Sequence, residues 1–496
     1  MSTVETHELA KVQYARRPTQ GVILGIDKYG LWSIGIAVFP VLVFVVARNL
    51  VGALVAAAIM APLAAGGFFK TEAGIPWTMH VLKVLQFKRR KATGMTKYRR
   101  RTGPIVKGHL ELPGHPNRFE IWETEKGSVV IWDKRSQMAS FTCVVASPGM
   151  AQHSVSVSTP EEREGLIAGW MTVCGAWTRR QQIARVTVQE RTRPGSVVVE
   201  QQQFDALKKT GPLAESYQEA LNLLADEVVW RPSTITLTID TGTSEGRSLV
   251  KRHGGGKTGV LALCEQEMGS TTEALMQAGF TRVAWCTPRE WAATGRGTVD
   301  PVGETAIDAR IGSAFEGVAP ELAGPMSLDE DKDYAETDSA FHRTYWVAEW
   351  PRIQTLPGFM GNVAFAESHH GYAVRHTFSL VGKPVPMKEA LKRIANDRKT
   401  WKQNARFKQD RAGTTIADNA DWLNLDAREQ DLVDGQGQLE FTGYLVVTAV
   451  TRDELEESCA AMEISAANAG VELLVMSYEQ QAGLIAVAYP VGMGMK

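Results

Sequence analysis

Cysteine is scarce in this chain, with five copies standing singly among 496 residues. None of them forms the C-x-x-C spacing that is typical of structural zinc sites. An odd and dispersed set also argues against a disulfide framework and fits a reducing compartment. His369, His370 and His376 gather in one stretch, but carboxylates at metal-ligand spacing are absent around them. The sequence therefore predicts no metal site, and we expect no bound cofactor.

Acidic residues are scarce in the front part of the chain. Residues 1–107 carry 16 Lys and Arg against 4 Asp and Glu, a balance of +12. The remaining residues carry 38 and 51, a balance of −13. The net charge of −1 therefore conceals a basic front end and an acidic body, which are expected to meet different partners.

Two uncharged apolar runs follow each other near the start, Leu31–Ala47 with 17 residues and Leu50–Phe69 with 20. A helix needs about 20 apolar residues to cross the bilayer core, so the second run suffices and the first barely does. Only Arg48 and Asn49 separate the runs, and small residues in the second run allow close helix packing. The pattern predicts a transmembrane helical hairpin at 31–69, with a buried hairpin of a soluble protein as the alternative.

The charge of the flanking segments predicts the orientation of this hairpin. Between Lys70 and Lys107 there are eleven Lys and Arg and a single acid, Glu72. Cytoplasmic flanks of membrane helices collect basic residues. We therefore expect a cytoplasmic leader at 1–30, a basic juxtamembrane segment at 70–107, and an inner-membrane protein with both termini in the cytoplasm.

Two basic clusters within the juxtamembrane segment are candidates for contact with lipid headgroups. Each Lys or Arg near an anionic membrane surface contributes about 1 kcal/mol to binding. Nucleic acid is the alternative ligand, and we favour lipid because an apolar hairpin precedes the clusters. The candidate headgroup contacts are Arg89, Arg90, Lys91, Arg99, Arg100 and Arg101.

From about Phe119 the chain changes to short β-rich runs that alternate with helical stretches. Thr159-Pro160-Glu161-Glu162 and Thr451-Arg-Asp-Glu454 each predict a capped helix start. The alternation predicts an α+β body. Strands are expected near 119–124, 128–133, 141–146, 183–190, 234–240, 345–350, 371–381, 438–449, 471–477 and 483–489.

Residues 293–340 interrupt this alternation and gain glycine, proline and acids. Asp329–Asp338 alone holds six acids and one lysine. Such a composition is typical of an exposed linker. We therefore expect two α+β sub-domains, at 108–292 and 341–496, on either side of this linker.

One glycine-rich stretch, His253–Thr258, invites comparison with a phosphate-binding P-loop. A P-loop needs a glycine five residues before the Gly of its Gly-Lys-Thr, and Lys251 occupies that position. The preceding residues 242–252 are polar and are expected to form a loop rather than the end of a strand. We therefore expect a flexible loop before a helix at 258–279. With no other catalytic motif in view, we expect the protein not to be an enzyme.

The stretch Tyr345–Arg352 is the candidate partner interface. Alternation along a strand would place Trp346 and Trp350 on one face. These rings either fill the core or lie at a seam between subunits, because aromatic residues and arginine are enriched at interfaces. The candidate interface residues are Tyr345, Trp346, Glu349, Trp350 and Arg352.

A leader, a tight apolar hairpin, a basic segment and a long α+β body thus follow one another. Four stretches mark the body: Ile167–Trp170 with Trp177, Gly254–Gly256, Thr344–Arg352 and Phe441–Thr448. Over roughly residues 14–490, the chain resembles actinobacterial membrane proteins encoded with conjugative, type IV secretion-like machinery. The front end is similar to the PrgI-like small membrane subunit, and the body is similar to the N-terminal non-ATPase part of the large secretion ATPase.

This resemblance implies a non-enzymatic inner-membrane scaffold for export of macromolecules, DNA in particular. The motor domain of the large ATPase is not visible in the sequence, so ATP hydrolysis would come from a separate subunit that this scaffold docks. The implied partners are membrane lipid and other subunits of an oligomeric complex, with nucleic acid at most indirect. A core subunit of a type VII secretion system and a membrane-tethered, P-loop-like nucleotide-dependent enzyme are the alternatives.

Overall fold

A computed structural model describes most of the chain: residues 28–69, 71, 76–101, 103–146, 159–225, 228–351, 355, 358–409, 416–433 and 437–494. These residues fall into two compact units. The body is formed by Thr96–Met387 and Gly435–Lys496, and the helical unit by Tyr14–Met95 and Lys388–Asp434.

Helices and strands alternate along the chain, as in other mixed α+β proteins. The helices are α1 (Lys28–Val46), α2 (Leu50–Phe68), α3 (Trp77–Ala92), α4 (Pro160–Thr178), α5 (Val198–Leu207), α6 (Pro212–Leu224), α7 (Ser244–Arg252), α8 (Gly256–Gln277), α9 (Pro288–Val299), α10 (Glu304–Asp308), α11 (Gly361–Ala364), α12 (Met387–Gln409), α13 (Ile416–Val433), α14 (Arg452–Asn468) and α15 (Gln480–Ala488), with a 3-10 turn at Pro320–Leu322. The strands are β1 (Lys97–Arg99), β2 (His109–Leu112), β3 (His115–Glu123), β4 (Val129–Asp133), β5 (Met138–Ala146), β6 (Ile183–Pro194), β7 (Val229–Trp230), β8 (Ser233–Asp240), β9 (Arg282–Trp285), β10 (Ser327–Glu330), β11 (Ala335–Glu336), β12 (Phe341–Glu349), β13 (His376–Val385), β14 (Gln438–Ala449) and β15 (Glu472–Val475).

One large antiparallel sheet is the frame of the body, which confirms the expected α+β class. Its strands follow the order β1-β10-β11-β12-β14-β13-β6-β8-β5-β4-β3-β2, with β15, β7 and β9 beside β12, β6 and β5. At the centre, β13 pairs with β6 from His376 opposite Thr192 to Gly382 opposite Val186. Strands from both 108–292 and 341–496 therefore belong to one sheet.

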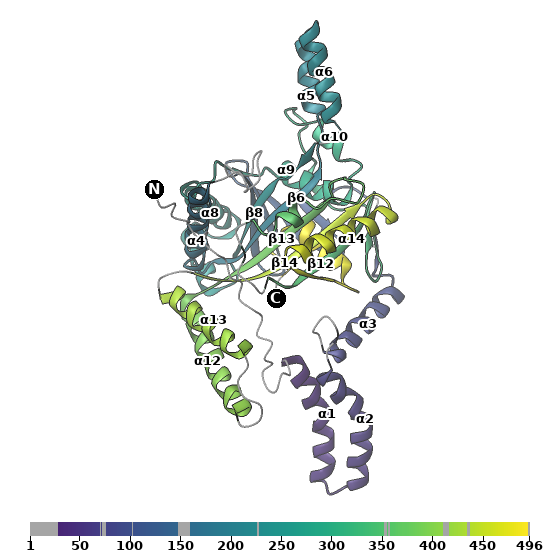
Figure 1. The fold of residues 1–496 in the computed structure, drawn as a ribbon, viewed down its shortest axis with the longest axis vertical. Helices are drawn as coiled ribbons and strands as arrows, with labels where there is room; N and C mark the ends of the chain where they lie inside the picture. Colours follow the sequence, from purple (N-terminus) through teal and green to yellow (C-terminus); the bar gives the residue numbers. More distant parts are fainter. Residues whose placement is uncertain are drawn as a thin grey trace, which may run out of the picture. The chain divides into compact units, whose positions relative to one another are not determined.

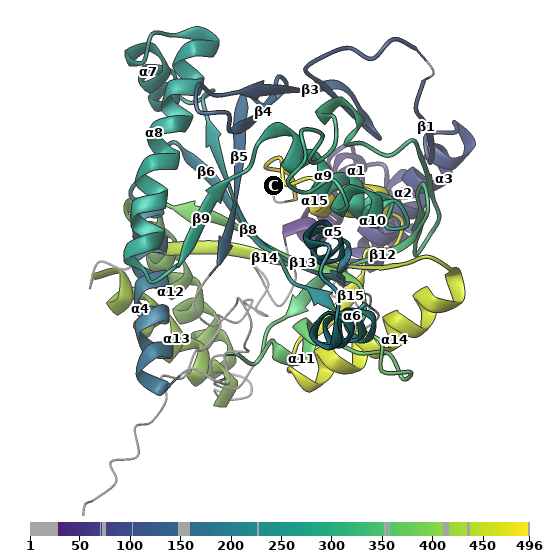
Figure 2. The ribbon, with the colours of Figure 1, turned by 90° about the horizontal axis from the view of Figure 1, so that it is seen from above.

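Helices cover both faces of this sheet (Figure 2). On one face α4 and α8 lie over β5 and β8, in a core that includes the fully buried Trp177. On the other face α9 and α15 enclose a second core around Tyr489. Along β14, Val446 joins this second core, whereas Leu445 and Val447 join a third core beneath α14. Successive side chains of a strand point to opposite faces, so one strand serves two cores.

The acidic segment 293–340 is part of the body, so the expectation of an exposed linker was wrong. The segment contributes α10, β10 and β11, and β10 pairs with both β1 and β11. Its acids have basic partners: Arg296 forms ion pairs with Asp300 at 2.8 Å and with Asp338 at 2.7 Å. Composition alone indicated exposure because it does not reveal which basic side chains fold against the acids.

Two further expectations were wrong for local reasons. The run at 483–489 forms helix α15 (Gln480–Ala488) rather than a strand, and every residue of this helix except Ala482 is buried. A short apolar run enclosed on all sides has no periodicity that distinguishes a helix from a strand. The polar stretch at 242–252 forms α7, where the Thr243 side chain accepts a hydrogen bond from the backbone N–H of Gly246 and caps the helix.

The capped helix at Thr451 was predicted correctly. The Thr451 hydroxyl and the Glu454 carboxylate make the reciprocal capping box at the start of α14. The strand expected at 438–449 coincides with β14. In the helical unit, α12 and α13 pack against each other through the rings of Trp401 and Trp422, whose centres lie 4.7 Å apart.

Candidate functional site

The helices α1 and α2 form a closely packed hairpin in the helical unit (Figure 1). Small residues line their contact: Ala53 and Ala56 are buried, and a Cβ atom on Gly67 would lie 2.2 Å from the hydroxyl of Ser33. Asn49 in the turn caps α2 by accepting a hydrogen bond from the backbone N–H three residues later. Close approach at small residues is typical of paired membrane helices.

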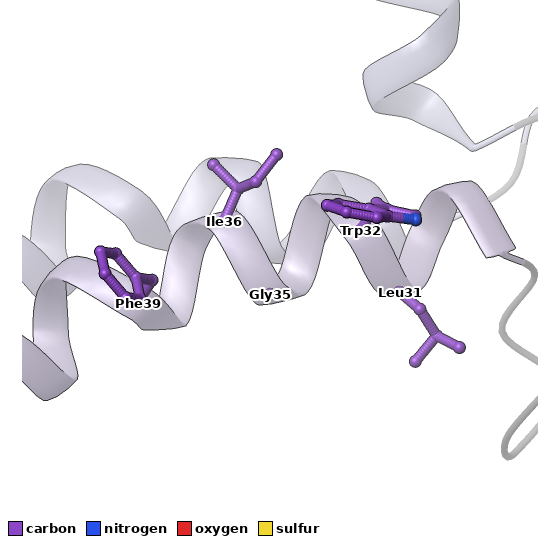
Figure 3. Close-up of a pocket in the computed structure, with 5 residues that line it drawn as sticks. All are labelled: Leu31, Trp32, Gly35, Ile36 and Phe39. Atoms are coloured by element: carbon purple, nitrogen blue, oxygen red, sulfur yellow. The ribbon is translucent and has the colours of Figure 1, made fainter.

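The outward side of this hairpin is apolar and exposed. Trp32, Leu54 and Ile59 are 65%, 70% and 66% exposed, and 17% of the apolar window of α2 is buried. A shallow hollow of about 450 Å³ on α1 is lined by Leu31, Trp32, Gly35, Ile36 and Phe39. Figure 3 shows these residues along the helix. Contiguous exposed apolar surface of this kind is typical of a membrane or partner contact. A core helix of a soluble protein would instead be mostly buried.

The two helices of the hairpin, α1 and α2, differ in the length of their apolar part. Within the described residues, α2 is the one helix that length and composition qualify to cross a membrane. The apolar part of α1, Gly30–Val46, is shorter. At 1.5 Å per residue its 17 residues span about 26 Å, somewhat less than the hydrocarbon core of about 30 Å. A membrane hairpin therefore stays a proposal, which the exposed apolar surface supports.

Helix α3 is basic at one end and apolar along its exposed side. Arg89, Arg90 and Lys91 occupy its last turn, and the first turn contains no acid. Trp77 and Leu85 are 53% and 58% exposed. Arg90 and Lys91 lie over the ring of Phe87, at 5.6 and 5.9 Å. An exposed helix with these two kinds of side chain is typical of segments that lie in a membrane interface.

In the second basic cluster, Arg99–Arg101, two of the three side chains make contacts within the body. Arg99 forms an ion pair with Asp329 across the β1–β10 ladder, and its Nη2 lies 2.9 Å from Asp329 Oδ2. Arg100 donates a hydrogen bond of 2.8 Å to the carbonyl oxygen of Glu321. Arg101 is exposed. The structure therefore assigns Arg99 and Arg100 to internal contacts, and we expect α3 to supply the stronger lipid contact.

Strand β12 places the candidate interface residues on different sides of the sheet. Tyr345 is fully buried, and its hydroxyl donates a hydrogen bond of 2.8 Å to Glu463 Oε1. Trp346 lies opposite Tyr444, which packs against the core of α9 and α15. Trp350 instead packs against the core beneath α14, on the side of Val347. The expectation that both tryptophans share one face was therefore wrong.

An irregularity in the ladder explains this difference. The pairing of β12 with β15 shifts between Val347 and Glu349, which interrupts the strict alternation of side chains. Beyond the shift, Glu349 stands opposite Glu472. Arg352 lies outside the described residues. The sequence showed the aromatic and charged residues of this strand but could not show the shift.

Beside Trp350 the body has an acidic hollow of about 560 Å³. Glu349 of β12, Glu472 of β15 and Glu463 of α14 contribute three carboxylates to its wall. The indole of Trp350 is held by ring contacts with Phe378 and Phe441, with centres 6.4 and 5.5 Å apart. Carboxylates beside an indole ring favour a basic side chain of a partner, through charge pairing and through contact of the cation with the ring.

The glycine-rich stretch joins two helices. Gly254, Gly255 and Gly256 have positive φ angles between the end of α7 and the start of α8. A P-loop instead leads from a strand into a helix. Lys257 lies over the ring of Trp122, with its Nζ 5.0 Å from the ring centre. The helix–loop–helix context agrees with the expectation that this is no P-loop, which stays a prediction.

A serine motif that the sequence interpretation missed precedes this loop. Gly242–Gly246 reads Gly-Thr-Ser-Glu-Gly and follows strand β8, which matches the G-x-S-x-G spacing of hydrolase nucleophile elbows. Ser244, however, is the first residue of α7 and does not have the positive φ of a strained elbow. No described histidine makes a hydrogen bond to its hydroxyl. Among the described residues, no histidine is therefore placed to act as the base that a nucleophilic serine needs.

One group among the described residues has metal-ligand geometry. The ligand atoms of His369, His370 and Glu457 all lie within 4.8 Å of one another, and His369 Nδ1 is 2.7 Å from Glu457 Oε1. The carboxylate comes from α14 and was therefore invisible to spacing along the sequence. His376 lies apart from this group because it is buried in β13, where burial lowers its pKa to about 4.

All five cysteines are buried free thiols. Burial raises the pKa of Cys174 to about 12 and that of Cys459 to about 11. A thiol must ionise to act as a nucleophile or a metal ligand. These side chains are therefore unreactive packing residues.

Comparison with known proteins adds no relative, since no family model and no curated protein matches this sequence. The class of the protein is therefore defined by its own architecture. It is a mixed α+β protein with one large antiparallel sheet and an apolar helical hairpin.

Proposed function

We propose that this protein is a non-enzymatic inner-membrane scaffold of a conjugative, type IV secretion-like apparatus. The hairpin of α1 and α2 anchors it, and the body docks a separate cytoplasmic secretion ATPase. The exposed apolar surface of the hairpin is the observation that supports membrane anchoring. Helix α2 is 19 residues long and mostly unburied. Water would solvate such a surface poorly, whereas lipid chains match it.

Charge supports the proposed orientation. The basic last turn of α3 follows the hairpin and would lie at the anionic cytoplasmic surface, where basic residues are attracted. Both termini then lie in the cytoplasm. The link to secretion rests on the resemblance of the chain to conjugation proteins, and the scaffold is proposed to act within an oligomeric complex.

Docking of the ATPase is proposed at the acidic hollow around Trp350. Its three carboxylates fit a basic side chain, and aromatic residues are enriched among those that dominate interface energies. The buried Tyr345 donates a hydrogen bond to Glu463 and so holds one of these carboxylates in place. Arg352 remains a candidate for the same seam, whereas Trp346 lies on the other face of the sheet.

Alkaline carbonate extraction tests the anchoring. An arginine at the centre of a membrane helix costs about 2.5–3.5 kcal/mol of insertion free energy. We expect the wild type to stay in the membrane pellet and Ile59→Arg to be released. Ile464→Arg is the matched control, because Ile464 on α14 is 63% exposed and Ile59 is 66% exposed. Release of the wild type by carbonate would contradict the proposal.

Pull-down of the secretion ATPase tests the docking independently. Glu349→Lys and Glu472→Lys should abolish capture, whereas Glu336→Lys, at an exposed position elsewhere in the body, should not. Capture of type VII secretion subunits in place of a conjugative ATPase would favour that alternative. Normal capture by both charge-reversal variants would remove the hollow as the docking site.

A further inference from the structure

Two neighbouring histidines stand at the tip of a tight turn in the body. His369 and His370 are the central residues of the turn Ser368–Gly371, in which the backbone N–H of Gly371 donates a hydrogen bond of 2.9 Å to the carbonyl oxygen of Ser368. Gly371 has a φ angle of 81°, which glycine adopts without strain. The turn therefore fixes the backbone from which both imidazole rings project.

The segments on either side of this turn pack against helix α14. Ala366 and Val374 are buried in the same core as Leu455 and Cys459 of α14. Helix α11, which precedes the turn, also lies against α14 (Figure 2). A hydrogen bond of 2.9 Å from the backbone N–H of Val374 to the carbonyl oxygen of Ala366 closes the base of the hairpin. The turn and the helix thus hold fixed positions within one compact unit.

Glu457 of α14 faces the two imidazoles. One ligand atom each of His369, His370 and Glu457 lies within 4.8 Å of the other two, and His369 Nδ1 is 2.7 Å from Glu457 Oε1. Zinc bonds of about 2.0–2.1 Å at tetrahedral angles place two ligand atoms about 3.3 Å apart. The observed separations lie on both sides of that value. Because His369 is 67% exposed, rotation of its ring is enough to adjust them.

The carboxylate of Glu457 has no lysine or arginine partner among the described residues. The adjacent Glu456, in contrast, forms an ion pair of 2.7 Å with Arg343. Glu457 Oε1 is enclosed by protein, and its contact with His369 Nδ1 is not aligned as an N–H donation. A partly buried carboxylate without a basic partner favours a bound cation.

The two imidazole rings are also close to each other, with centres 3.7 Å apart. Two protonated imidazoles at this separation would repel each other, whereas neutral imidazoles can each offer a nitrogen lone pair to the same ion. Imidazole suits zinc and the neighbouring transition metals, while Mg²⁺ and Ca²⁺ prefer oxygen ligands alone. The ligand types therefore favour a transition-metal ion.

We propose that His369, His370 and Glu457 bind a divalent transition-metal ion, with zinc as the expected occupant. Two histidines and one glutamate form a known zinc ligand set that leaves a fourth position for water. The ion would clip the turn to α14 and so cross-link two segments that are far apart in the chain. Spacing along the sequence predicted no metal site because Glu457 is near the histidines only in the fold. This role is structural and does not depend on the secretion function proposed above.

Titration of the full-length protein with zinc tests this proposal, in detergent, without a histidine tag, and with a chromophoric chelator as competitor. We expect a dissociation constant of about 1 μM or below. Loss of a hydrogen-bond partner of a metal ligand costs about 10–100-fold in affinity, so loss of a ligand in His369→Gln, His370→Gln or Glu457→Gln should cost about 100-fold or more. His253→Gln is the control, because the His253 ring contacts a carbonyl oxygen and the Gln266 amide instead of a carboxylate, and its affinity should equal that of the wild type.

Thermal unfolding with and without zinc gives a second readout. Zinc should raise the Tm of the wild type and of His253→Gln, but not that of Glu457→Gln, because only an ion bound to the folded chain stabilises it. Magnesium should not displace zinc. The proposal is overturned if the wild type binds no zinc or if magnesium displaces it. Wild-type affinity in Glu457→Gln would also overturn it, since the histidines alone would then hold an adventitious ion only.

Discussion

Glu349 of β12 stands directly opposite Glu472 of β15 in the antiparallel ladder beside Trp350. Like charges in directly opposed positions destabilise a sheet by a few tenths to about 1 kcal/mol. Both residues line the acidic hollow, together with Glu463. A structure that retains this repulsion at its surface is expected to use the negative charge for binding, which is the role proposed above for the hollow.

Removal of one charge of this pair should stabilise the isolated protein. Glu472→Gln is expected to raise the free energy of unfolding by about 0.2–1 kcal/mol at low salt, because repulsion across the ladder is relieved. High salt should reduce the gain, since exposed charges are screened. Urea unfolding at two salt concentrations measures both effects. A loss of stability at low salt would show that Glu472 has a favourable role within the folded chain.

Truncation of Trp350 separates packing from partner binding. Truncation of a fully buried tryptophan to alanine lowers the free energy of unfolding by about 3–5 kcal/mol. Because Trp350 is half-buried, Trp350→Ala should lower it by about 2 kcal/mol. Tyr372→Ala is the control, because Tyr372 is 71% exposed and its truncation should leave stability nearly unchanged. Thermal unfolding measures the two variants. Unchanged stability of Trp350→Ala would contradict its packing against Phe441.

Stability should depend on pH through His342. This side chain is fully buried, with its Nε2 2.7 Å from Thr337 Oγ1 and its Nδ1 2.9 Å from Thr448 Oγ1. Burial lowers the pKa of His342 from about 6.5 to about 3. As pH falls below 6.5, the unfolded chain takes up a proton that the folded chain does not. The free energy of unfolding should therefore fall by about 1.4 kcal/mol per pH unit below that point.

The slope rather than the absolute stability tests this assignment. His342→Gln should unfold more easily at pH 7, because it disturbs both hydrogen bonds, but its stability should decline less steeply between pH 6.5 and 5. Denaturant unfolding at several pH values gives both slopes. Parallel slopes for the variant and the wild type would assign the pH dependence to other groups, His376 among them.

The glycine loop should be dispensable for ATP-dependent chemistry. Lys257 lies over Trp122 in a loop between two helices, so Lys257→Ala should leave substrate transfer near the wild-type level. The same substitution of the phosphate-binding lysine in the partner ATPase should abolish transfer and serves as the control. A complete loss of transfer for Lys257→Ala at normal protein levels would revive the nucleotide-dependent alternative.

Long, uniform patterns were the features that the sequence predicted best. The apolar runs gave α1 and α2, and the β-rich run at 438–449 gave β14, because many residues contributed to each pattern. The short strands β10 and β11 were missed, since two to four residues contain too little periodicity. Helix α15 was mistaken for a strand because its apolar residues from Gly483 to Ala488 are all buried.

The buried ion pairs and the candidate metal site depended on contacts that sequence spacing does not reveal. Arg191 and Arg193 lie on a strand whose alternating charges suggest a solvated face, yet their partner Glu304 is more than a hundred residues away in the chain. Glu457 completes the histidine group from α14 in the same manner. Such pairings follow from strand order and helix placement, which local patterns do not determine.

Cysteine labelling in intact cells tests the central claim, a membrane hairpin with a cytoplasmic body, most directly. The native cysteines are all buried, so a single added cysteine can report alone. Ala47→Cys in the hairpin turn should react with a membrane-impermeant maleimide from outside, and Ser216→Cys on the exposed side of α6 should react only after lysis. Labelling of Ser216→Cys in intact cells, or protection of Ala47→Cys until lysis, would contradict the account.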